Sequence, residues 1–335
     1  MFYYKTKFSL RRTLHPNSIV KGSLQMTNHK YLSIDIGGTN IKYGLINQAG
    51  QISFKAKLAT PDQKEPFLAA IDQLIADYAP KVSGIAFCAP GKIEKSTICF
   101  GGALPFLDGI DFAQRYHHLA LPLTVINDGK AAALAESWLG NLKDIKNGAA
   151  IILGTGVGGG IIINGQLLAG SHFQAGELSY MTMDPTQTKS TEDSPMGPGF
   201  TGGTLSTVGL IKKINELTKH ENLLDGLVAF KELEAGANQQ VTALFEEYCH
   251  HVACLIMNVQ SVVDLEKFVI GGGISAQPLV IKGFNQAYDD LYHTNEAVAL
   301  TLCRPQITVA KFNNDANLYG ALYQLLLTTA PEKFN

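Results

Sequence analysis

Strands that run directly into glycine-rich turns recur in this chain, and this repeat constrains the fold more than any other feature. Asp35-Ile36-Gly37-Gly38-Thr39 opens the pattern, Leu153-Gly154-Thr155-Gly156 repeats it, and Ile270-Gly271-Gly272-Gly273 completes it. Glycine lets a backbone approach a ligand closely and turn its N–H groups toward an anion. A single turn of this kind is most simply an ordinary hairpin. Three are explained more economically by two phosphate-facing hairpins and a nucleoside-facing loop that close on one nucleotide.

The composition is that of a globular protein with room for two domains. The chain has 335 residues, of which 46% are hydrophobic and 17% charged, and its 33 glycines indicate many tight turns. A net charge of −2 gives no case for a nucleic-acid-binding surface. No apolar run approaches the roughly 20 residues that span a bilayer. The five cysteines include no Cys-x-x-Cys pair, which is typical of reduced thiols and predicts a cytoplasmic protein.

The N-terminal residues differ from the rest of the chain. The first 25 carry five lysines and arginines, no acidic residue, and no continuous apolar core of the kind found in a signal peptide. The first predicted strand begins only after them. We therefore expect residues 1–29 to be a tail outside the folded protein, with Met26 as an alternative natural start.

The order of the predicted elements is that of an α/β protein, and it repeats. Strands are predicted at 31–36, 41–47, 51–57, 84–88 and 121–126, with helices at 67–78 and 129–139. After a polar break at 143–148, hairpin strands return, followed by a helix at 238–262, a strand at 267–270, a helix at 279–292, a strand at 306–310 and a helix at 316–327. Two βββαβα-like halves predict an internally duplicated fold, with two lobes and a central cleft.

A buried strand delivers two polar residues, Asn127 and Asp128, to the start of an alanine-rich helix. Considered alone, Asp128 is most simply a helix cap, whose carboxylate accepts backbone N–H bonds. Such bonds would lower its pKa and make it a weaker base. Phosphoryl transfer through a loose transition state asks mainly for orientation of the attacking hydroxyl, so a capped Asp128 could still serve as the base. Asn127 has both a donor and an acceptor, which suits a vicinal diol.

Two further segments have the equipment to contact a sugar. Glu177, in Gly176-Glu177-Leu178, could accept hydrogen bonds from two hydroxyl groups, and the alternative is an exposed charge beside a turn. Gly91, in Ala89-Pro90-Gly91, could offer its backbone to a ligand or belong to an ordinary turn. The adjacent histidine pairs, His117-His118 and His250-His251, point to different helix faces and make poor joint metal ligands.

Taken together and in this order, these motifs resemble the ROK sugar kinases (the repressor, open reading frame and kinase family). That family has the actin-like, ribonuclease H-like ATPase fold. The resemblance covers roughly Lys30 to Leu327. It implies a small α/β lobe at 30–127, a large α/β lobe at 128–313, and a C-terminal helix at 314–330 that packs back on the small lobe.

The resemblance also implies ATP with Mg²⁺ as the phosphoryl donor and the 6-hydroxyl group of a hexose or hexoside as the acceptor. Asp128 becomes the catalytic base, and Asn127, Glu177, Tyr180 and Gly91 become sugar contacts. The implied nucleotide and phosphate contacts are Asp35, Gly37, Gly38, Thr39, Asn40, Lys42, Gly154, Thr155, Gly156, Gly158, Gly272 and Gly273. Asp35 would also hold Mg²⁺ through ATP. The implied partners are a small-molecule sugar and a second copy in a homodimer, with no nucleic acid and no membrane.

The chain departs from the family pattern in two places. Most ROK kinases have a histidine three residues after the glutamate that matches Glu177, and this chain has Tyr180 there. Residues 181–204 contain neither Cys nor His, so this segment cannot form the family's structural zinc site, and a further sugar-binding glutamate is missing near Gly202-Gly203-Thr204. The resemblance is therefore closest to the zinc-less branch, which includes kinases of β-glucosides and of N-acetylmannosamine. Weaker discrimination at C1 and C2 of the sugar follows from the lost polar groups.

The main alternative is a non-catalytic, sugar-binding ROK regulator. Such repressors add a helix-turn-helix module, and the residues before Met26 are about 25 in number and show no helical pattern. A different actin-like phosphotransferase is disfavoured by the Asn127-Asp128 pair and by Gly176-Glu177-Leu178. Retention of Asp128 and of both glycine hairpins argues against a degenerate kinase that binds sugar without turning it over.

Overall fold

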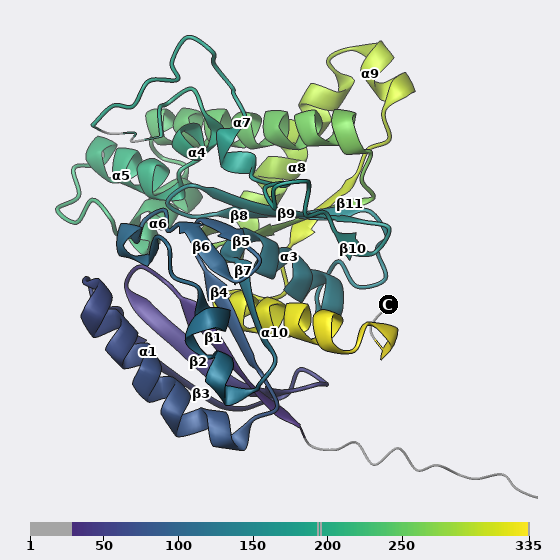
Figure 1. Cartoon of the computed structure of the whole chain (residues 1–335). Coiled ribbons are helices and arrows are strands. Elements are labelled where there is room, and N and C mark those ends of the chain that lie inside the picture. The colour runs from purple at the N-terminus through teal and green to yellow at the C-terminus, as the bar shows by residue number, and fades with distance from the viewer. Residues whose placement is uncertain (1–28, 193, 195, 334–335) are drawn as a thin grey trace, which may run out of the picture.

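The computed structural model describes residues 29–192, 194 and 196–333 (Figure 1). Nearly all of the predicted N-terminal tail, and Met26 with it, lies outside the described residues. No helix in the described ranges is both long and apolar enough to cross a bilayer.

The first half of the chain builds a five-stranded sheet in the order β3-β2-β1-β4-β7. In this sheet β1 pairs with β2 in antiparallel fashion and with β4 in parallel. Phe67, Ile71 and Leu74 are spaced along one helix face, and burial of that face packs α1 (Lys64–Tyr78) on the sheet. The strands are β1 (Lys30–Ile36), β2 (Asn40–Asn47), β3 (Ile52–Ala59), β4 (Ile85–Ala89) and β7 (Leu123–Asn127).

The second half builds a sheet of the same design in the order β10-β9-β8-β11-β12. The first strand of each half pairs antiparallel with the second and parallel with the fourth, and the fourth pairs parallel with the fifth. The predicted internal duplication and the α/β class are therefore confirmed. The strands are β8 (Gly148–Leu153), β9 (Val157–Ile163), β10 (Gln166–Leu167), β11 (Lys267–Gly271) and β12 (Gln306–Val309).

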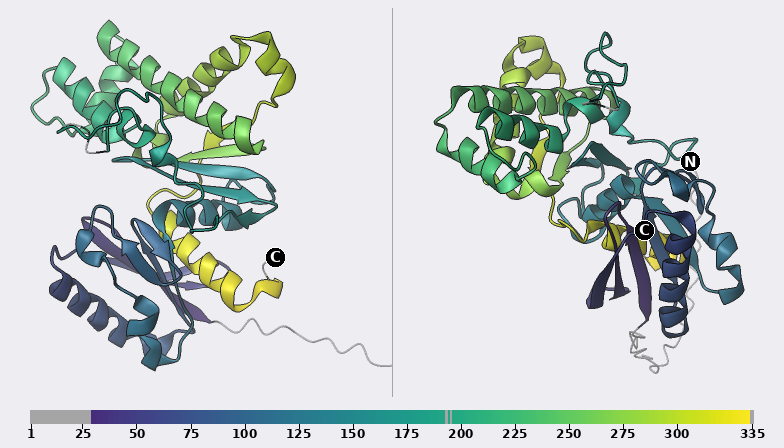
Figure 2. Two further views of the ribbon diagram at one scale, coloured as in Figure 1. Left: turned by 45° about the horizontal axis from the view of Figure 1, so that its top comes forward. Right: turned by 90° about the vertical axis from the view of Figure 1, so that its left-hand side faces the viewer.

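Two helices lie between the sheets, and each follows the last strand of its half (Figure 2). α3 (Asp128–Leu139) follows β7 and packs on β8 and β9, the strands of the other half. α10 (Ala316–Thr329) follows β12 and packs on β1 and β4. The two helices also pack on each other, so each half contributes one helix to the face of its neighbour.

The outer face of the second sheet is covered by α7 (Gln239–Val263) and α8 (Pro278–His293). The sequence predicted both helices, but it missed several shorter elements. Those are β5 (Lys92–Glu94), β6 (Thr97–Phe100), α2 (Phe112–Arg115), α4 (Thr201–Thr204), α5 (Thr207–Leu217), α6 (Gly226–Ala235) and α9 (Glu296–Thr301). Five of them are too short to show a clear period. α5 and α6 are longer, and α5 buries Leu210 and Ile214 at helical spacing, a signal that was overlooked.

The contact between α3 and α10 is close enough to require a glycine. A Cβ added at Gly320 of α10 would overlap the backbone carbonyl of Ala131 of α3. Further along α3, the buried Glu136 carboxylate accepts hydrogen bonds from the backbone N–H groups of Asn141, at 2.7 Å, and Phe312, at 2.8 Å. The end of α3 is thereby tied to the segment that leads into α10.

Gly320→Ala tests this helix contact. Since the overlapping atoms belong to the backbone of α3, the helices must move apart, and we expect the free energy of unfolding to fall by about 3 kcal/mol. Gly209→Ala is the matched control, because it also replaces a glycine inside a helix with alanine. A Cβ at Gly209 meets only the Ser206 side chain, at 3.4 Å, so no backbone has to move. Urea denaturation of both variants measures the effect. A Gly320→Ala protein as stable as the parent would contradict the packing described.

Candidate active site

A cleft with a volume of about 2270 Å³ is lined by residues of both halves. The first half contributes Asp35 and the Gly37-Gly38 turn, and the second contributes the turn and strand start at Gly154–Gly158. Small-molecule pockets usually have volumes of about 300–1,000 Å³. This cleft is therefore large enough to hold two substrates together.

Both predicted glycine hairpins are confirmed as hairpins. The Gly37 N–H donates to the Asn40 carbonyl at 3.1 Å in the turn between β1 and β2, and the Gly154 N–H donates to the Gly156 carbonyl at 3.0 Å between β8 and β9. A Cβ added at Gly38 or Gly154 would meet no atom within 4 Å. The backbone of both turns thus borders open space, as a backbone cradle for an anion requires.

Some residues predicted to contact the nucleotide lie away from this cleft. The Thr39 carbonyl accepts from the Thr60 N–H at 3.0 Å, and neither Thr39 nor Asn40 lines the cleft. Gly272 and Gly273 line a smaller adjoining cavity of about 350 Å³, which shares Lys42 with the cleft. Gly272 has a φ of 95°, and a Cβ there would overlap the Leu153 carbonyl, so only glycine fits at this position.

Asp35 ends in a buried carboxylate that neighbouring side chains hold in place. Its Oδ1 accepts from the Asn317 side-chain amide at 3.0 Å, and its Oδ2 accepts from Lys42 Nζ at 3.4 Å. Lys42 Nζ also donates to the Asn314 carbonyl at 3.1 Å. The sequence analysis missed Asn317. The one signal for Asn317 in the sequence was that it is a polar residue near the start of the last apolar helix.

Asn127, and not Asp128, caps helix α3. The Asn127 Oδ1 accepts from the Lys130 N–H at 3.3 Å, and its Nδ2 donates to the Gly91 carbonyl at 2.9 Å. Asp128 is the first helical residue and accepts one backbone bond, from the Gly129 N–H at 2.8 Å. Gly91 has a φ of 84°, and a Cβ there would overlap the backbone of Phe100. The amide of Asn127 and the turn at Gly91 are therefore fixed against each other.

The expected lowering of the Asp128 pKa is wrong. Asp128 opens to the cleft, but the protein surrounding it at this depth displaces bulk water, and this loss of solvation raises its pKa to about 6. The single bond from the Gly129 N–H acts in the opposite direction, while the Asp35 and Glu177 carboxylates raise the pKa further. Because Asn127 takes the cap position, Asp128 receives too few backbone bonds to offset its surroundings. A carboxyl group of this kind titrates close to neutral pH, where a general base is effective.

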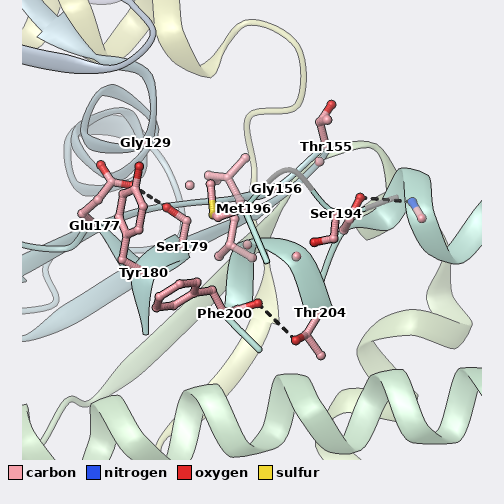
Figure 3. A pocket seen from close by; sticks show the side chains of 18 of the residues that line it. Gly129, Thr155, Gly156, Glu177, Ser179, Tyr180, Ser194, Met196, Phe200 and Thr204 are labelled. Atoms are coloured by element: carbon pink, nitrogen blue, oxygen red, sulfur yellow. Dashed lines mark hydrogen bonds between the residues drawn. The ribbon is translucent and has the colours of Figure 1, made fainter. Parts of the chain in front are cut away.

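Glu177 and Tyr180 border the same cleft from the second half. Glu177 immediately precedes the short helix η4 (Leu178–Tyr180), and its Oε1 accepts from the Ser179 hydroxyl at 2.8 Å. Figure 3 shows the Glu177 and Tyr180 side chains pointing in the same direction, with the Tyr180 ring at an edge-on angle to Phe200, 6.3 Å away between ring centres.

The segment where the family pattern predicts a further glutamate is crowded at both of its glycines. A Cβ added at Gly202 would overlap the Met196 sulfur, and one at Gly203 would overlap the Gly197 carbonyl. Among the described residues, no group of three or more His, Cys, Asp and Glu side chains could hold a metal ion. Asp128 and Glu177 are among the carboxylates that line the cleft, and Asp35 lines it beside the glycine turns.

Lys130 is a site residue that the sequence analysis missed. It is only 7% exposed, lines the cleft, and lies on the first turn of α3, two residues after Asp128. Burial lowers the pKa of its ammonium group, and the nearby Glu177 and Asp128 carboxylates act in the opposite direction. A lysine among alanines near the start of the helix was the available signal. Its burial depends on packing against the second half, which local patterning does not show.

Several known proteins are similar to this chain over most of its length. The β-glucoside kinase of Listeria monocytogenes is 29% identical over 311 residues, covering 89% of this chain and 97% of the relative. The glucokinase of Halalkalibacterium halodurans is 30% identical over 330 residues, covering 88% and 94%. A ROK family protein from Streptococcus pneumoniae, solved in complex with sucrose, is 30% identical with a TM-score of 0.77, covering 89% of this chain and 98% of that one.

The duplicated halves, the cleft and the paired glycine hairpins define an actin-like phosphotransferase, and the similarity to solved ROK structures confirms this fold. The sequence profile of the ROK family matches residues 31–327, and the chain belongs to the ROK family. Its named relatives are sugar kinases, so the protein is a carbohydrate kinase. Such enzymes use ATP, generally with Mg²⁺, and small-molecule sugars.

The raised Asp128 pKa predicts a pH-dependent cost to stability. The folded protein binds the Asp128 proton more tightly than the unfolded chain, so this residue lowers stability as the pH rises from the ordinary value of 3.8 to about 6. We expect the Tm of Asp128→Asn to exceed that of the parent by a margin that grows over this range and is constant above it. Thermal unfolding across pH 4–8 measures the margin. A margin that shrinks as the pH rises would contradict the raised pKa.

Proposed function

We propose that this kinase transfers the γ-phosphoryl group of ATP to the 6-hydroxyl group of a hexose or hexoside, with Asp128 as the base. The observation that carries the proposal is the position of Asp128, a carboxyl group with a pKa of about 6 at the depth of a cleft that both glycine hairpins line. An acceptor hydroxyl beside Asp128 would face the terminal phosphate held by the turns.

The donor side of the proposal uses the two hairpin turns and Asp35. The backbones at Gly37-Gly38 and Gly154–Gly156 line the cleft, with open space at Gly38 and Gly154, and suit the phosphate oxygens. A single carboxylate beside them fits Mg²⁺ that is bound mainly by ATP phosphates and water, since Mg²⁺ seldom needs a complete protein cage. Lys42 and Asn317 would orient Asp35 for that role. Bound Mg²⁺ would neutralise charge on the transferred phosphoryl group.

The chemical step then requires a positioned hydroxyl and a proton acceptor. Asp128 takes the proton of the 6-hydroxyl group as the sugar oxygen bonds to the γ-phosphorus, and the bond from that phosphorus to the β,γ-bridging oxygen breaks to release ADP. Asn127, Gly91 and Glu177 would hold the other sugar hydroxyls and so restrict the attack to one oxygen. Lys130 would offset the charge of the two carboxylates at this end of the cleft.

The acceptor class follows from Tyr180 and from the missing glutamate near Gly202. We propose a β-glucoside, N-acetylmannosamine or glucose as the acceptor, with C1-substituted sugars or several hexoses accepted. The Streptococcus pneumoniae relative was solved with sucrose, which is a glucose substituted at C1. The lobe boundaries at 127/128 and 313/314, the cytoplasmic location and the homodimer stay predictions.

Asp128→Asn tests the proposed base. The amide keeps the shape of the side chain but cannot accept the proton, so we expect kcat to fall by about 10²–10⁴-fold while the sugar still binds. In the parent, kcat/KM should rise as the pH passes about 6, because the base must be ionised. Asp77→Asn, which changes an exposed carboxylate on α1, is the matched control and should leave kcat unchanged.

The measurements are a coupled ATP assay for kcat and calorimetry for sugar binding. If the Asp128→Asn protein turned over sugar at the parental rate, Asp128 would not be the catalytic base. Loss of sugar binding together with turnover would make Asp128 a binding residue instead.

A sugar panel tests the acceptor class. We expect turnover of cellobiose, or of several among glucose, N-acetylmannosamine and fructose, because the polar groups that would reject a changed C1 or C2 are absent. The same coupled ATP assay gives kcat/KM for each sugar. A strong and exclusive preference for free glucose would contradict this part of the proposal.

A further inference from the structure

Three large aromatic side chains that line the cleft are exposed. Phe100 is 51% exposed, Phe173 is 44% exposed and Tyr180 is 55% exposed. Aromatic rings are generally well buried, and exposed apolar groups that gather at a cleft are typical of ligand-binding surfaces. The proposed sugar contacts include Tyr180 and leave the two phenylalanines without a role.

Phe100 is attached directly to the sugar side of the cleft. It ends β6, pairs with Lys92 across the small β5–β6 sheet, and packs its backbone carbonyl against Gly91. The Gly91 carbonyl in turn accepts from Asn127 at 2.9 Å. One chain of backbone and amide contacts therefore joins the Phe100 position to the residue beside Asp128.

Phe173 comes from the opposite half and has a strained backbone. It precedes Glu177 by four residues and has a φ of 59°, in the left-handed region that a bulky side chain rarely adopts. Strain of this kind persists where the surrounding structure enforces it, often at ligand-binding sites. Phe100 and Phe173 line the same cleft, one from each half of the chain.

The direction of the substrate follows from the proposed reaction. If the 6-hydroxyl group lies at Asp128, the C1 and C2 end of the pyranose ring points away from the base. In the proposed arrangement that end would lie toward Tyr180, which lines the same cleft. A substituent on C1 would continue outward, past Tyr180, toward a cleft border that carries Phe100 on one half and Phe173 on the other.

We propose that Phe100, Phe173 and Tyr180 form a subsite for the C1 substituent of a hexoside, and that this subsite takes a flat group with an apolar face. Aryl rings and the apolar face of a second pyranose share that chemistry. The inference rests on the proposed function, because it needs the 6-hydroxyl group at Asp128. It makes the exposed rings specificity-determining residues and predicts a hexoside, in preference to a free hexose, as the favoured acceptor.

The test compares three β-glucosides that differ only in the C1 substituent. We expect the parent to show a kcat/KM for 4-nitrophenyl β-glucoside about 10-fold above that for methyl β-glucoside, with cellobiose showing whether a second sugar ring is also preferred. The double variant Phe100→Thr, Phe173→Asn removes both rings, and Asn accepts the left-handed backbone at 173. It should lower kcat/KM for the aryl glucoside about 10-fold and change that for the methyl glucoside less than twofold.

Phe54→Ala is the matched control, since Phe54 is 40% exposed on β3 and lies outside the lining of the cleft. It should alter neither substrate. Equal use of aryl and methyl glucosides by the parent overturns the inference, and so does an equal loss of both in the double variant. In either case turnover of methyl β-glucoside leaves the proposed function standing. A protein that phosphorylates no sugar overturns the proposed function, and this inference falls with it.

Discussion

The close packing of α3 on its neighbours is the constraint on which the site depends. The start of α3 carries Asp128, and a Cβ at Gly129 would overlap the backbone of Gly159 in β9. Gly159 and Gly160 of β9 therefore let the helix approach the second sheet. On its other side α3 meets α10, which carries Asn317 and thereby fixes Asp35. The contact between α3 and α10 thus fixes the position of Asp128, the proposed base, relative to Asp35 beside the glycine turns.

The same arrangement explains the electrostatics of the cleft. Asp35, Asp128 and Glu177 are among the carboxylates on its lining, and Lys42 and Lys130 are among its cations. Lys42 pairs with Asp35 at 3.4 Å. At Asp128, loss of solvation is the main cause of a pKa raised to about 6, and the Asp35 and Glu177 carboxylates add to it. Functional groups held at a cost in this way are common at active sites. The proposed base is accordingly expected to work near neutral pH.

The architecture was largely predictable because short-range sequence patterns mark most of its strands and helices. Alternating apolar residues and glycine turns marked the hairpins on both halves, and helical spacing marked α1, α7, α8 and α10. Short elements such as β5 and β6 lacked such a signal. At the site, the residue types of Asn127, Asp128 and Glu177 were visible in the sequence. Three features were not visible, because they depend on tertiary packing. They are the choice of Asn127 over Asp128 as the cap of α3, the burial of Lys130, and the hydrogen bond from Asn317 to Asp35.

The central claim is that the cleft presents the 6-hydroxyl group of a sugar to Asp128 and excludes the other hydroxyls. The most direct measurement is the position of the phosphate in the product, read by two-dimensional ³¹P–¹H NMR after turnover of methyl β-glucoside with ATP. This substrate has no free hydroxyl group at C1 and still has several others. The account predicts coupling of phosphorus to the two protons on C6 alone. Coupling to a proton on C2, C3 or C4 would contradict it.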